Sequence, residues 1–270
     1  MINNSNRKIK HEIVIEELTW QPSKEKKNIL DHINFCFEDE NFYGIIGPNG
    51  SGKTSLVKHL LRFREVKSGK IELDETNLKD YNRQELAKKI ALVPQNTMMD
   101  FAFQAYDIVM MGRSPYQKRF ADASEADQKL VMEAMKLTDC YDMKEKEVSL
   151  LSGGEAQRVI TARAIAQDTK WLILDEPTSS LDVKHQIELM EALVKLKERK
   201  SKTIIAVLHD INIAARYCNK IIMMKDGKIH SHGNTEEVLT KENLYEVYGI
   251  QFELLEASKT GKIYYIPCGS

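Results

Sequence analysis

Residues 47–54 read GPNGSGKT and directly follow the apolar run 43–46. Glycines allow backbone conformations in which successive N–H groups turn toward one point, where they bind an anion together with the positive end of a following helix. The lysine of this pattern reaches the β- and γ-phosphates of a nucleotide, and the hydroxyl after it binds Mg²⁺. We therefore predict a loop that binds nucleotide phosphates, made of Gly47, Pro48, Asn49, Gly50, Ser51, Gly52, Lys53, Thr54 and Ser55.

The alternative for this stretch is an ordinary glycine-rich turn with a surface lysine. Apolar residues recur at helical spacing over 55–61, which favours the phosphate loop because that loop leads into a helix. We expect Lys53 to face solvent when no nucleotide is bound.

Two adjacent carboxylates end another apolar run, 171–174. Phosphoryl transfer to water requires an anchor for Mg²⁺ and a group that orients or deprotonates the attacking water, and two acids at one strand end can supply one each. We assign the metal to Asp175 and proton acceptance to Glu176. The alternative is that both acids simply begin a turn before Pro177.

Three apolar runs, 90–93, 171–174 and 203–208, are bounded by breaking residues. Continuous apolar runs of this length are typical of strands that are buried on both faces of a mainly parallel sheet covered by helices. Ligands of such α/β sheets bind beyond the carboxyl ends of the strands. We expect that edge to carry Gln95, Asp175, Glu176 and His209.

The N-terminal part predicts an antiparallel β subdomain beside this core. Its strands are expected over 12–18, 33–37 and 42–46, with the charged stretch 23–27 as a solvated loop. Residues 1–11 are expected to form a flexible arm.

The segment of about 96–167 predicts an inserted α-helical subdomain. Ser124 and Asp127 form a capping box for a helix that continues to about Leu137. A second helix is expected over 155–167, after a break at Gly153-Gly154. Beyond the core, Asp226-Gly227 indicates a hairpin over 221–230, and Thr240 is expected to cap a last helix that ends near Val247.

The composition limits the classes of protein to which this chain can belong. With 270 residues, 42% of them hydrophobic, the chain can bury a substantial core. Its 39 basic and 40 acidic residues give no electrostatic reason to bind nucleic acid. The cysteines are scattered without metal-ligand spacing, so we expect no disulfide framework. The N-terminus lacks the apolar centre of a signal peptide, and no apolar run approaches the roughly 20 residues that span a bilayer. We therefore expect a cytoplasmic chain with only indirect membrane contact.

The motifs together, in their order, resemble the ATP-binding subunit of an ABC transporter from about residue 13 to residue 249. They are GPNGSGKT, Gln95 after Val93-Pro94, Leu151-Ser152-Gly153-Gly154-Glu155, LILDEP, Ser180-Leu181-Asp182 and His209-Asp210. The LSGGE stretch discriminates most, because two glycines ahead of a helix offer open N–H groups to a phosphate. By itself, Ser152 with Glu155 would be an ordinary capping box.

The resemblance implies a P-loop ATPase domain over 12–250, with a C-terminal extension over 251–270. It implies ATP and Mg²⁺ as cofactors and a homodimer in which each ATP lies between the phosphate loop of one copy and Ser152, Gly153, Gly154 and Glu155 of the other. Asp182 would communicate across the dimer. Gln95 would contact Mg²⁺ and the attacking water, Thr54 and Asp175 would complete the metal site, and His209 would contact the γ-phosphate.

The family usually stacks an aromatic residue on adenine, and here the position is blurred by the longer segment 21–27. Trp20 is the candidate, with Pro22 at what would be the usual position. A buried core tryptophan is the alternative for Trp20.

Residues 107–116 and 237–249 resemble the branch of the family that serves iron-siderophore, haem and cobalamin importers. That branch implies integral-membrane permease subunits encoded separately, an indirect link to a solute-binding protein, and a peripheral position on the cytoplasmic face of the membrane. Two alternatives stay open: the ATPase of another ABC system, such as a zinc or manganese importer or a soluble cofactor-assembly ATPase, and a nucleotide-binding module without useful hydrolysis.

Overall fold

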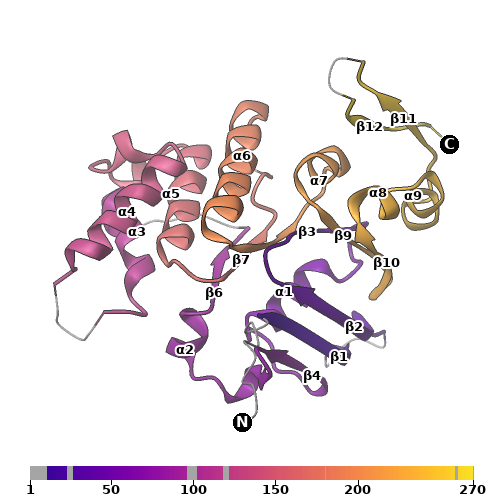
Figure 1. Cartoon of the computed structure of the whole chain (residues 1–270), viewed down its shortest axis with the longest axis horizontal. Coiled ribbons are helices and arrows are strands. Elements are labelled where there is room, and N and C mark those ends of the chain that lie inside the picture. The colour runs from indigo at the N-terminus through magenta and orange to yellow at the C-terminus, as the bar shows by residue number, and fades with distance from the viewer. Residues whose placement is uncertain are drawn as a thin grey trace, which may run out of the picture.

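The computed structural model describes residues 11–22, 27–95, 102–117, 122–179, 181–258 and 261–269. A central sheet separates an antiparallel sheet from a group of helices, and a small hairpin lies at the C-terminal end (Figure 1). The predicted arm, except His11, and the charged loop, except Lys27, lie outside the described residues.

The core sheet is mainly parallel, as predicted. Its strand order is β10-β9-β3-β8-β7-β6, and only the β9–β10 pair is antiparallel among the described strands of this sheet. All residues of β3, β7 and β8 are buried, which agrees with strands covered on both faces. The strands are β3 (Phe42–Ile46), β6 (Ile90–Val93), β7 (Trp171–Asp175), β8 (Thr203–Val207), β9 (Lys220–Lys225) and β10 (Lys228–Asn234).

The antiparallel sheet differs from the prediction in its membership. It has the order β2-β1-β4-β5, with β1 (Glu12–Trp20), β2 (Leu30–Glu38), β4 (Ser68–Leu73) and β5 (Thr76–Asn77). The assignment of 42–46 to this sheet was wrong, because that strand is buried on both faces and lies in the middle of the parallel sheet.

Three helices, α3 (Ala105–Met110), α4 (Glu125–Leu137) and α5 (Gly153–Ala166), lie between β6 and β7 in the chain and form the helical group on the left of Figure 1. Ser124 and Asp127 form the predicted capping box of α4. The predicted break at Gly153-Gly154 is wrong, because both glycines lie in the first turn of α5.

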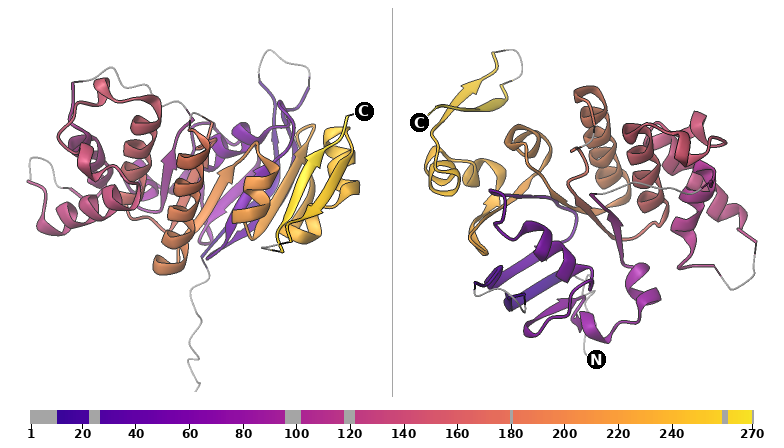
Figure 2. Two further views of the ribbon diagram at one scale, coloured as in Figure 1. Left: turned by 90° about the horizontal axis from the view of Figure 1, so that it is seen from above. Right: turned by 180° about the vertical axis from the view of Figure 1, so that it is seen from behind.

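The remaining helices surround the sheet. They are α1 (Lys53–Leu60), α2 (Arg83–Ala87), α6 (Val183–Lys200), α7 (Ile211–Tyr217), α8 (Thr235–Val238) and α9 (Lys241–Tyr248), which Thr240 caps as predicted. The chain ends in a hairpin of β11 (Phe252–Glu256) and β12 (Ile263–Pro267), which lies away from the helical group (Figure 2). None of the described helices is long and apolar enough to cross a membrane.

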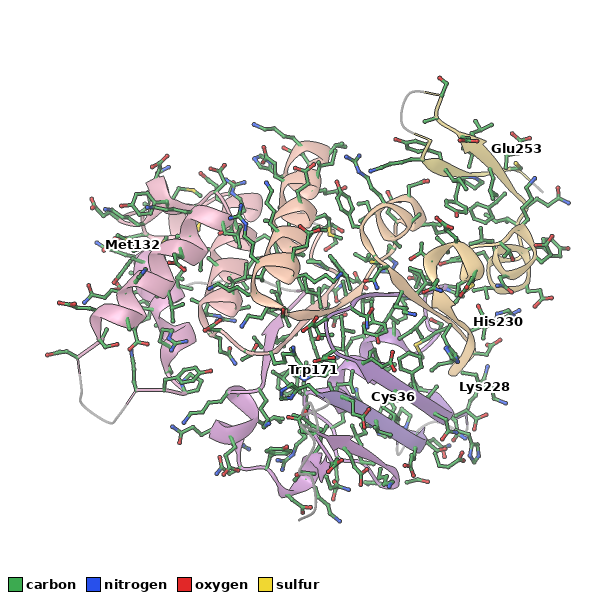
Figure 3. The ribbon with its side chains drawn as sticks, in the orientation of Figure 1. Cys36, Met132, Trp171, Lys228, His230 and Glu253 are labelled. Carbon is green, nitrogen blue, oxygen red and sulfur yellow. The ribbon has the colours of Figure 1, made fainter. Side chains whose placement is uncertain are left out.

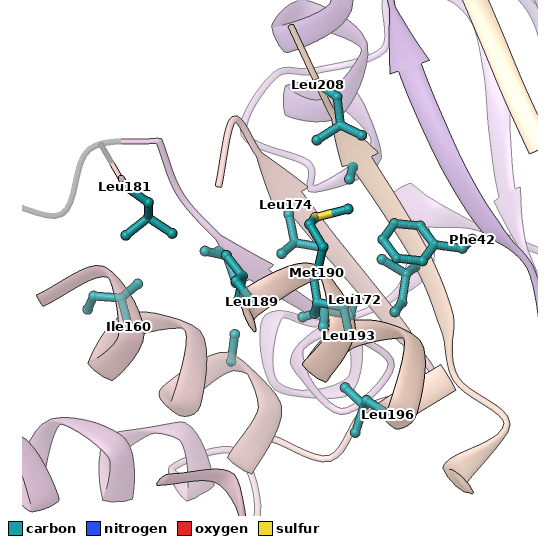
Figure 4. Packing of buried hydrophobic residues seen from close by; sticks show 14 of the residues in the cluster. Phe42, Ile160, Leu172, Leu174, Leu181, Leu189, Met190, Leu193, Leu196 and Leu208 are labelled. Carbon is teal, nitrogen blue, oxygen red and sulfur yellow. The ribbon is translucent and has the colours of Figure 1, made fainter. Parts of the chain in front are cut away.

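The core sheet divides the interior into two apolar clusters, because alternate residues of a strand face opposite sides. Trp171 of β7 packs on the side of α1 and the antiparallel sheet (Figure 3). Ile173 belongs to the same cluster. Leu172 and Leu174 pack on the side of α6 and the helical group (Figure 4). Apolar side chains therefore pack on both faces of β7, the strand that carries Asp175.

All four cysteines are free. Cys140 and Cys218 are buried in the cluster on the side of α6.

Candidate functional site

The phosphate loop connects β3 to α1, and its glycines are required by the space around them. Gly47 has φ 146°, and an added Cβ would lie 2.1 Å from the Met224 carbonyl oxygen. Gly52 has φ 103°, and an added Cβ would lie 2.7 Å from the Ile29 carbonyl oxygen. Around Gly50, by contrast, an added Cβ would meet no atom within 4 Å. The loop is thus packed on one side and open on the other, as a cradle for an anion requires.

Lys53 does not face solvent, so that expectation was wrong. Its side chain is 5% exposed, and its Nζ donates to the carbonyl oxygens of Gly47 at 2.8 Å and Pro48 at 2.9 Å. Burial lowers the pKa of Lys53, while the carboxylates of Glu176 and Asp175 act in the opposite direction. The Lys53 ammonium group therefore lies within the predicted phosphate loop, where it is bonded to the carbonyl oxygens of Gly47 and Pro48.

Ser51 and Tyr248 complete the surroundings of the loop. The Ser51 hydroxyl is buried and has no hydrogen-bond partner among the described residues, which fits a loop whose polar groups await a ligand. The Tyr248 hydroxyl, from α9, lies within hydrogen-bonding reach of the Gly47 backbone, and burial raises the pKa of Tyr248 to about 12. We did not foresee this contact, because nothing in the sequence links a residue of the last helix to the loop.

Glu176 lies between side chains from two neighbouring strand ends. The amide Nε2 of Gln95 donates to one carboxylate oxygen at 2.6 Å, and Nε2 of His209 lies 2.6 Å from the other. The Glu176 backbone has φ 53°, a left-handed conformation that is uncommon for a residue with a side chain. Its N–H donates to the Val207 carbonyl oxygen at 3.2 Å. The structure thus brings together Gln95, Glu176 and His209, as the strand pattern predicted.

Asp175 connects the phosphate loop to β7. The Thr54 hydroxyl donates to its Oδ1 at 3.3 Å. Burial raises the pKa of Asp175, and the neighbouring Glu176 charge raises it further. A buried carboxylate that is costly to ionise alone is suited to bind a cation.

The donor set at this point fits Mg²⁺. Mg²⁺ binds through one or two carboxylates together with substrate phosphates and water. Thr54 and Asp175 are in contact, and Gln95 lies at the next strand end. No group of three or more His, Cys, Asp or Glu side chains suited to a metal occurs within the described residues.

Ser152 forms a complete capping box at the start of α5. Its hydroxyl accepts the Glu155 N–H at 3.3 Å, and its own N–H donates to the Glu155 carboxylate at 2.8 Å. An added Cβ at Gly153 would meet no atom within 4 Å, so this helix end is open. The buried residues of α5 belong to a different apolar cluster from those of α1.

Asp182 caps the N-terminus of α6. It accepts the His185 N–H at 2.9 Å, and its Oδ1 also lies 2.8 Å from the His185 ring nitrogen Nδ1. Val183, the next residue, is 72% exposed. Ser180 lies outside the described residues.

Trp20, the last residue of β1, packs against two side chains that follow the phosphate loop in the chain. The Arg64 guanidinium lies 3.9 Å from the centre of its ring, and the ring of His59 meets it edge-on at 5.4 Å. His59 lies in the last turn of α1, and Arg64 lies in the segment after this helix. Adenine stacking on Trp20 stays a prediction, and it would require a ring face other than the one Arg64 covers.

Lys53→Ala is expected to abolish productive ATP binding, because the phosphate charge would lose its direct counter-ion in a partly desolvated site. We also expect the free energy of unfolding to fall by about 1–3 kcal/mol, since the Gly47 and Pro48 carbonyls would lose their donor. Titration with a fluorescent ATP analogue and chemical denaturation measure the two effects. Lys79→Ala, which removes an exposed lysine, is the control and should change neither. Near-parental nucleotide affinity of Lys53→Ala would contradict the assignment.

The chain resembles known proteins in sequence and fold. Residues 30–179 match the family model described as ABC transporter. The ferric enterobactin transport ATP-binding protein of Escherichia coli strain K12 is 34% identical over 244 residues, which cover 90% of each chain. The hemin import ATP-binding protein of Escherichia coli O157:H7 is 34% identical over 240 residues, which cover 87% of this chain and 91% of the relative.

Two solved structures extend the comparison. An inward-facing ABC transporter described as of the metal-chelate type has a TM-score of 0.83 and 28% identity, over 96% of this chain and 98% of that one. A dimeric ATP-binding cassette in a post-hydrolysis state with ADP and Pi has a TM-score of 0.73 and 29% identity, over 83% of this chain and 98% of that one. Motifs, fold and relatives agree with the predicted resemblance, and the chain belongs to the ABC transporter family.

Proposed function

We propose that this ABC ATPase powers a membrane importer of an iron chelate such as a siderophore, haem or a cobalamin-like solute. The catalytic part of this proposal rests on one observation, that the Glu176 carboxylate lies between the side chains of Gln95 and His209. The cargo class is supported by relatives that import ferric enterobactin and hemin, and by the likeness to a metal-chelate type transporter.

Glu176 is the proposed general base. Each of its oxygens has one partner here and keeps a further lone pair that could accept a proton from water. Gln95 and His209 are the groups predicted to turn toward the metal and the γ-phosphate. Nucleotide binding would therefore change the partners of the base in the same step in which it delivers the substrate.

Thr54, Asp175 and Gln95 would hold Mg²⁺. When bound, Mg²⁺ would offset the negative charge of the β- and γ-phosphates during transfer to water. Lys53 would exchange the carbonyl oxygens of Gly47 and Pro48 for phosphate oxygens, because an anion is a stronger partner for an ammonium group than a neutral carbonyl.

The open end of α5 supports a homodimer with two shared sites. Ser152, Gly153 and Gly154 would bind the γ-phosphate of ATP held by the other copy through N–H groups and the helix dipole. Glu155 would hold this helix start in shape through the capping box, and Asp182 would meet the other copy. The dimeric cassette with ADP and Pi supports this assembly.

A groove of about 830 Å³ supports docking of a permease subunit. It lies between the end of α1, α2, the turn after α3, and α5, and it is lined by Arg62, Phe63, Arg83, Met111 and Arg163 among others. Phe63 is 66% exposed. This combination of exposed apolar and cationic side chains fits a short permease helix with apolar and acidic residues. The chain would then sit on the cytoplasmic face of the membrane, and a solute-binding protein would act through the permease.

Glu176→Gln is expected to slow ATP hydrolysis by on the order of a hundredfold or more while ATP and Mg²⁺ still bind, because the amide keeps the shape but accepts no proton. The variant should accumulate as an ATP-bound dimer, detected by size exclusion with light scattering, and chelation of Mg²⁺ should reverse it. Hydrolysis at the parental rate would show that Glu176 is not the base.

Ser152→Arg is expected to leave ATP binding by the monomer intact and to block dimer formation and hydrolysis, because the added cation would lie in the interface. Simultaneous loss of binding would instead place Ser152 in its own subunit's pocket or core. Mixing Lys53→Ala and Ser152→Arg chains is the control, since their heterodimer would rebuild one complete site and regain part of the activity.

Cells that carry Glu176→Gln in place of the parental chain are expected to lose uptake of a radiolabelled iron chelate and to keep uptake of zinc and manganese. The tagged chain should also co-purify with a multi-span permease. Unchanged iron-chelate uptake with loss of zinc or manganese uptake would reject the proposed cargo class and leave the ATPase assignment in place.

A further inference from the structure

Arg113 joins three parts of the helical group through one guanidinium group. It lies in the turn directly after α3, and it is only 7% exposed. Its Nε donates to Oδ1 of Asp127, in the first turn of α4, at 2.7 Å. Its Nη1 donates to the carbonyl oxygens of Ala166 at 2.9 Å and Gln167 at 3.1 Å, at the C-terminal end of α5. One side chain therefore ties the turn after α3 to the start of α4 and the end of α5.

The backbone next to Arg113 also approaches α5 closely. An added Cβ at Gly112 would lie 2.2 Å from the Arg163 carbonyl oxygen, so a larger residue would push the turn away from this helix. The charges suit the helix ends that they meet, because a cation is favourable at the C-terminal end of α5 and the Asp127 carboxylate at the N-terminal end of α4. A buried guanidinium that loses a partner is destabilised, so we expect the turn, α4 and α5 to move as one body.

Gln167, which ends α5, is bonded to the core as well. Its amide Nε2 donates to the carbonyl oxygens of Ala87, at the end of α2, and of Ile90, the first residue of β6. The Gln84 side chain of α2 donates to the Pro115 carbonyl oxygen, two residues after Arg113, at 2.8 Å. The C-terminal end of α5 is therefore fixed both to the guanidinium group and to the core.

Ser152 lies at the opposite end of α5. This helix has 14 residues, which corresponds to a length of about 21 Å. A rotation of α5 about its C-terminal end therefore displaces Ser152 more than any other residue of the helix. The position of Ser152 relative to the phosphate loop thus depends on the contacts that hold the far end of α5.

We propose that Arg113 is a positioning residue for ATP hydrolysis, which acts through α5 by holding Ser152 where it meets the nucleotide of the other copy. The proposal rests on the proposed function, because it takes the role of Ser152 in the dimer as given. Arg113 acts at a distance from the nucleotide, since it lies at the other end of the helix. A guanidinium group suits this role, because its planar fork donates to a carboxylate and two carbonyl oxygens at once.

The test adds Arg113→Met to the Glu176→Gln chain and measures dimer dissociation with ATP and Mg²⁺ by sedimentation equilibrium. The dissociation constant is expected to rise at least tenfold, because the end of α5 loses its donor. With Glu176 intact, Arg113→Met should lower kcat at least tenfold and leave KM for ATP within twofold, since the phosphate loop itself is unchanged. A purely structural role would lower the melting temperature and leave the constants of the folded chain as they are.

Lys129→Met is the matched control, because Lys129 is exposed on α4 and its replacement removes the same charge from the same helical group. It should change neither the dissociation constant nor kcat, and an equal loss in this variant would reject the proposal. If Arg113→Met does not bind a fluorescent ATP analogue, Arg113→Lys replaces it. A single ammonium group does not reproduce the fork geometry, so the dissociation constant should still rise at least threefold.

An unchanged dissociation constant in an Arg113 variant that binds the ATP analogue would overturn the proposal and leave the nucleotide sandwich standing. Failure of the Glu176→Gln chain itself to dimerise with ATP would overturn both. A loss of affinity of the Arg113→Met monomer for the analogue equal to its loss of dimer would also reject the proposal, since the effect would then lie in the core rather than in α5.

Discussion

The arrangement of the site depends on one carboxylate, Glu176, which is held on both oxygens at the edge of a buried sheet. Its partners come from the strands on either side of β7, and each lies 2.6 Å away. The parallel register pairs Val93 with Leu174 and Asp175 with Val207, so the carboxyl ends of β6, β7 and β8 are aligned. Small displacements of β6 or β8 would break these bonds, so the close packing of two apolar clusters against the sheet is a condition for the chemistry.

The phosphate loop is held in shape by contacts within the chain. Lys53 bonds to the loop carbonyls, Thr54 bonds to Asp175, and Gly47 and Gly52 pack where no side chain fits. Binding of a ligand to such a loop costs little conformational entropy, because the loop is already ordered, and this favours tight binding. The same bonds must be exchanged on binding, so the loop, Asp175 and Glu176 respond to the nucleotide together.

Segments late in the chain reach back to this site. Tyr248 in the last helix lies against the Gly47 backbone, and Asn212 ties the C-terminal hairpin to the helix that follows His209. These contacts place the C-terminal residues next to the catalytic edge and the phosphate loop. The C-terminal hairpin is therefore attached to the helix that directly follows the catalytic edge of the sheet.

The sequence alone determined the parallel core, the phosphate loop and the residues at the strand ends, because glycine spacing, apolar runs and the polar residues that end them are local patterns. The capping box predicted at Ser124 was equally local and correct, and Ser152 with Glu155 forms the capping box that the sequence analysis gave as the alternative for that stretch. The longest of the described helices, α6, was missed, although Asp182 caps it and Leu189, Leu193 and Leu196 are buried along one side. The tertiary structure alone decided that 42–46 joins the parallel sheet, that Lys53 is buried, that Arg64 covers Trp20 and that Tyr248 reaches Gly47. Each of these depends on which distant segments meet, and strand partners, burial and long-range contacts are set by packing of the whole chain rather than by neighbouring residues.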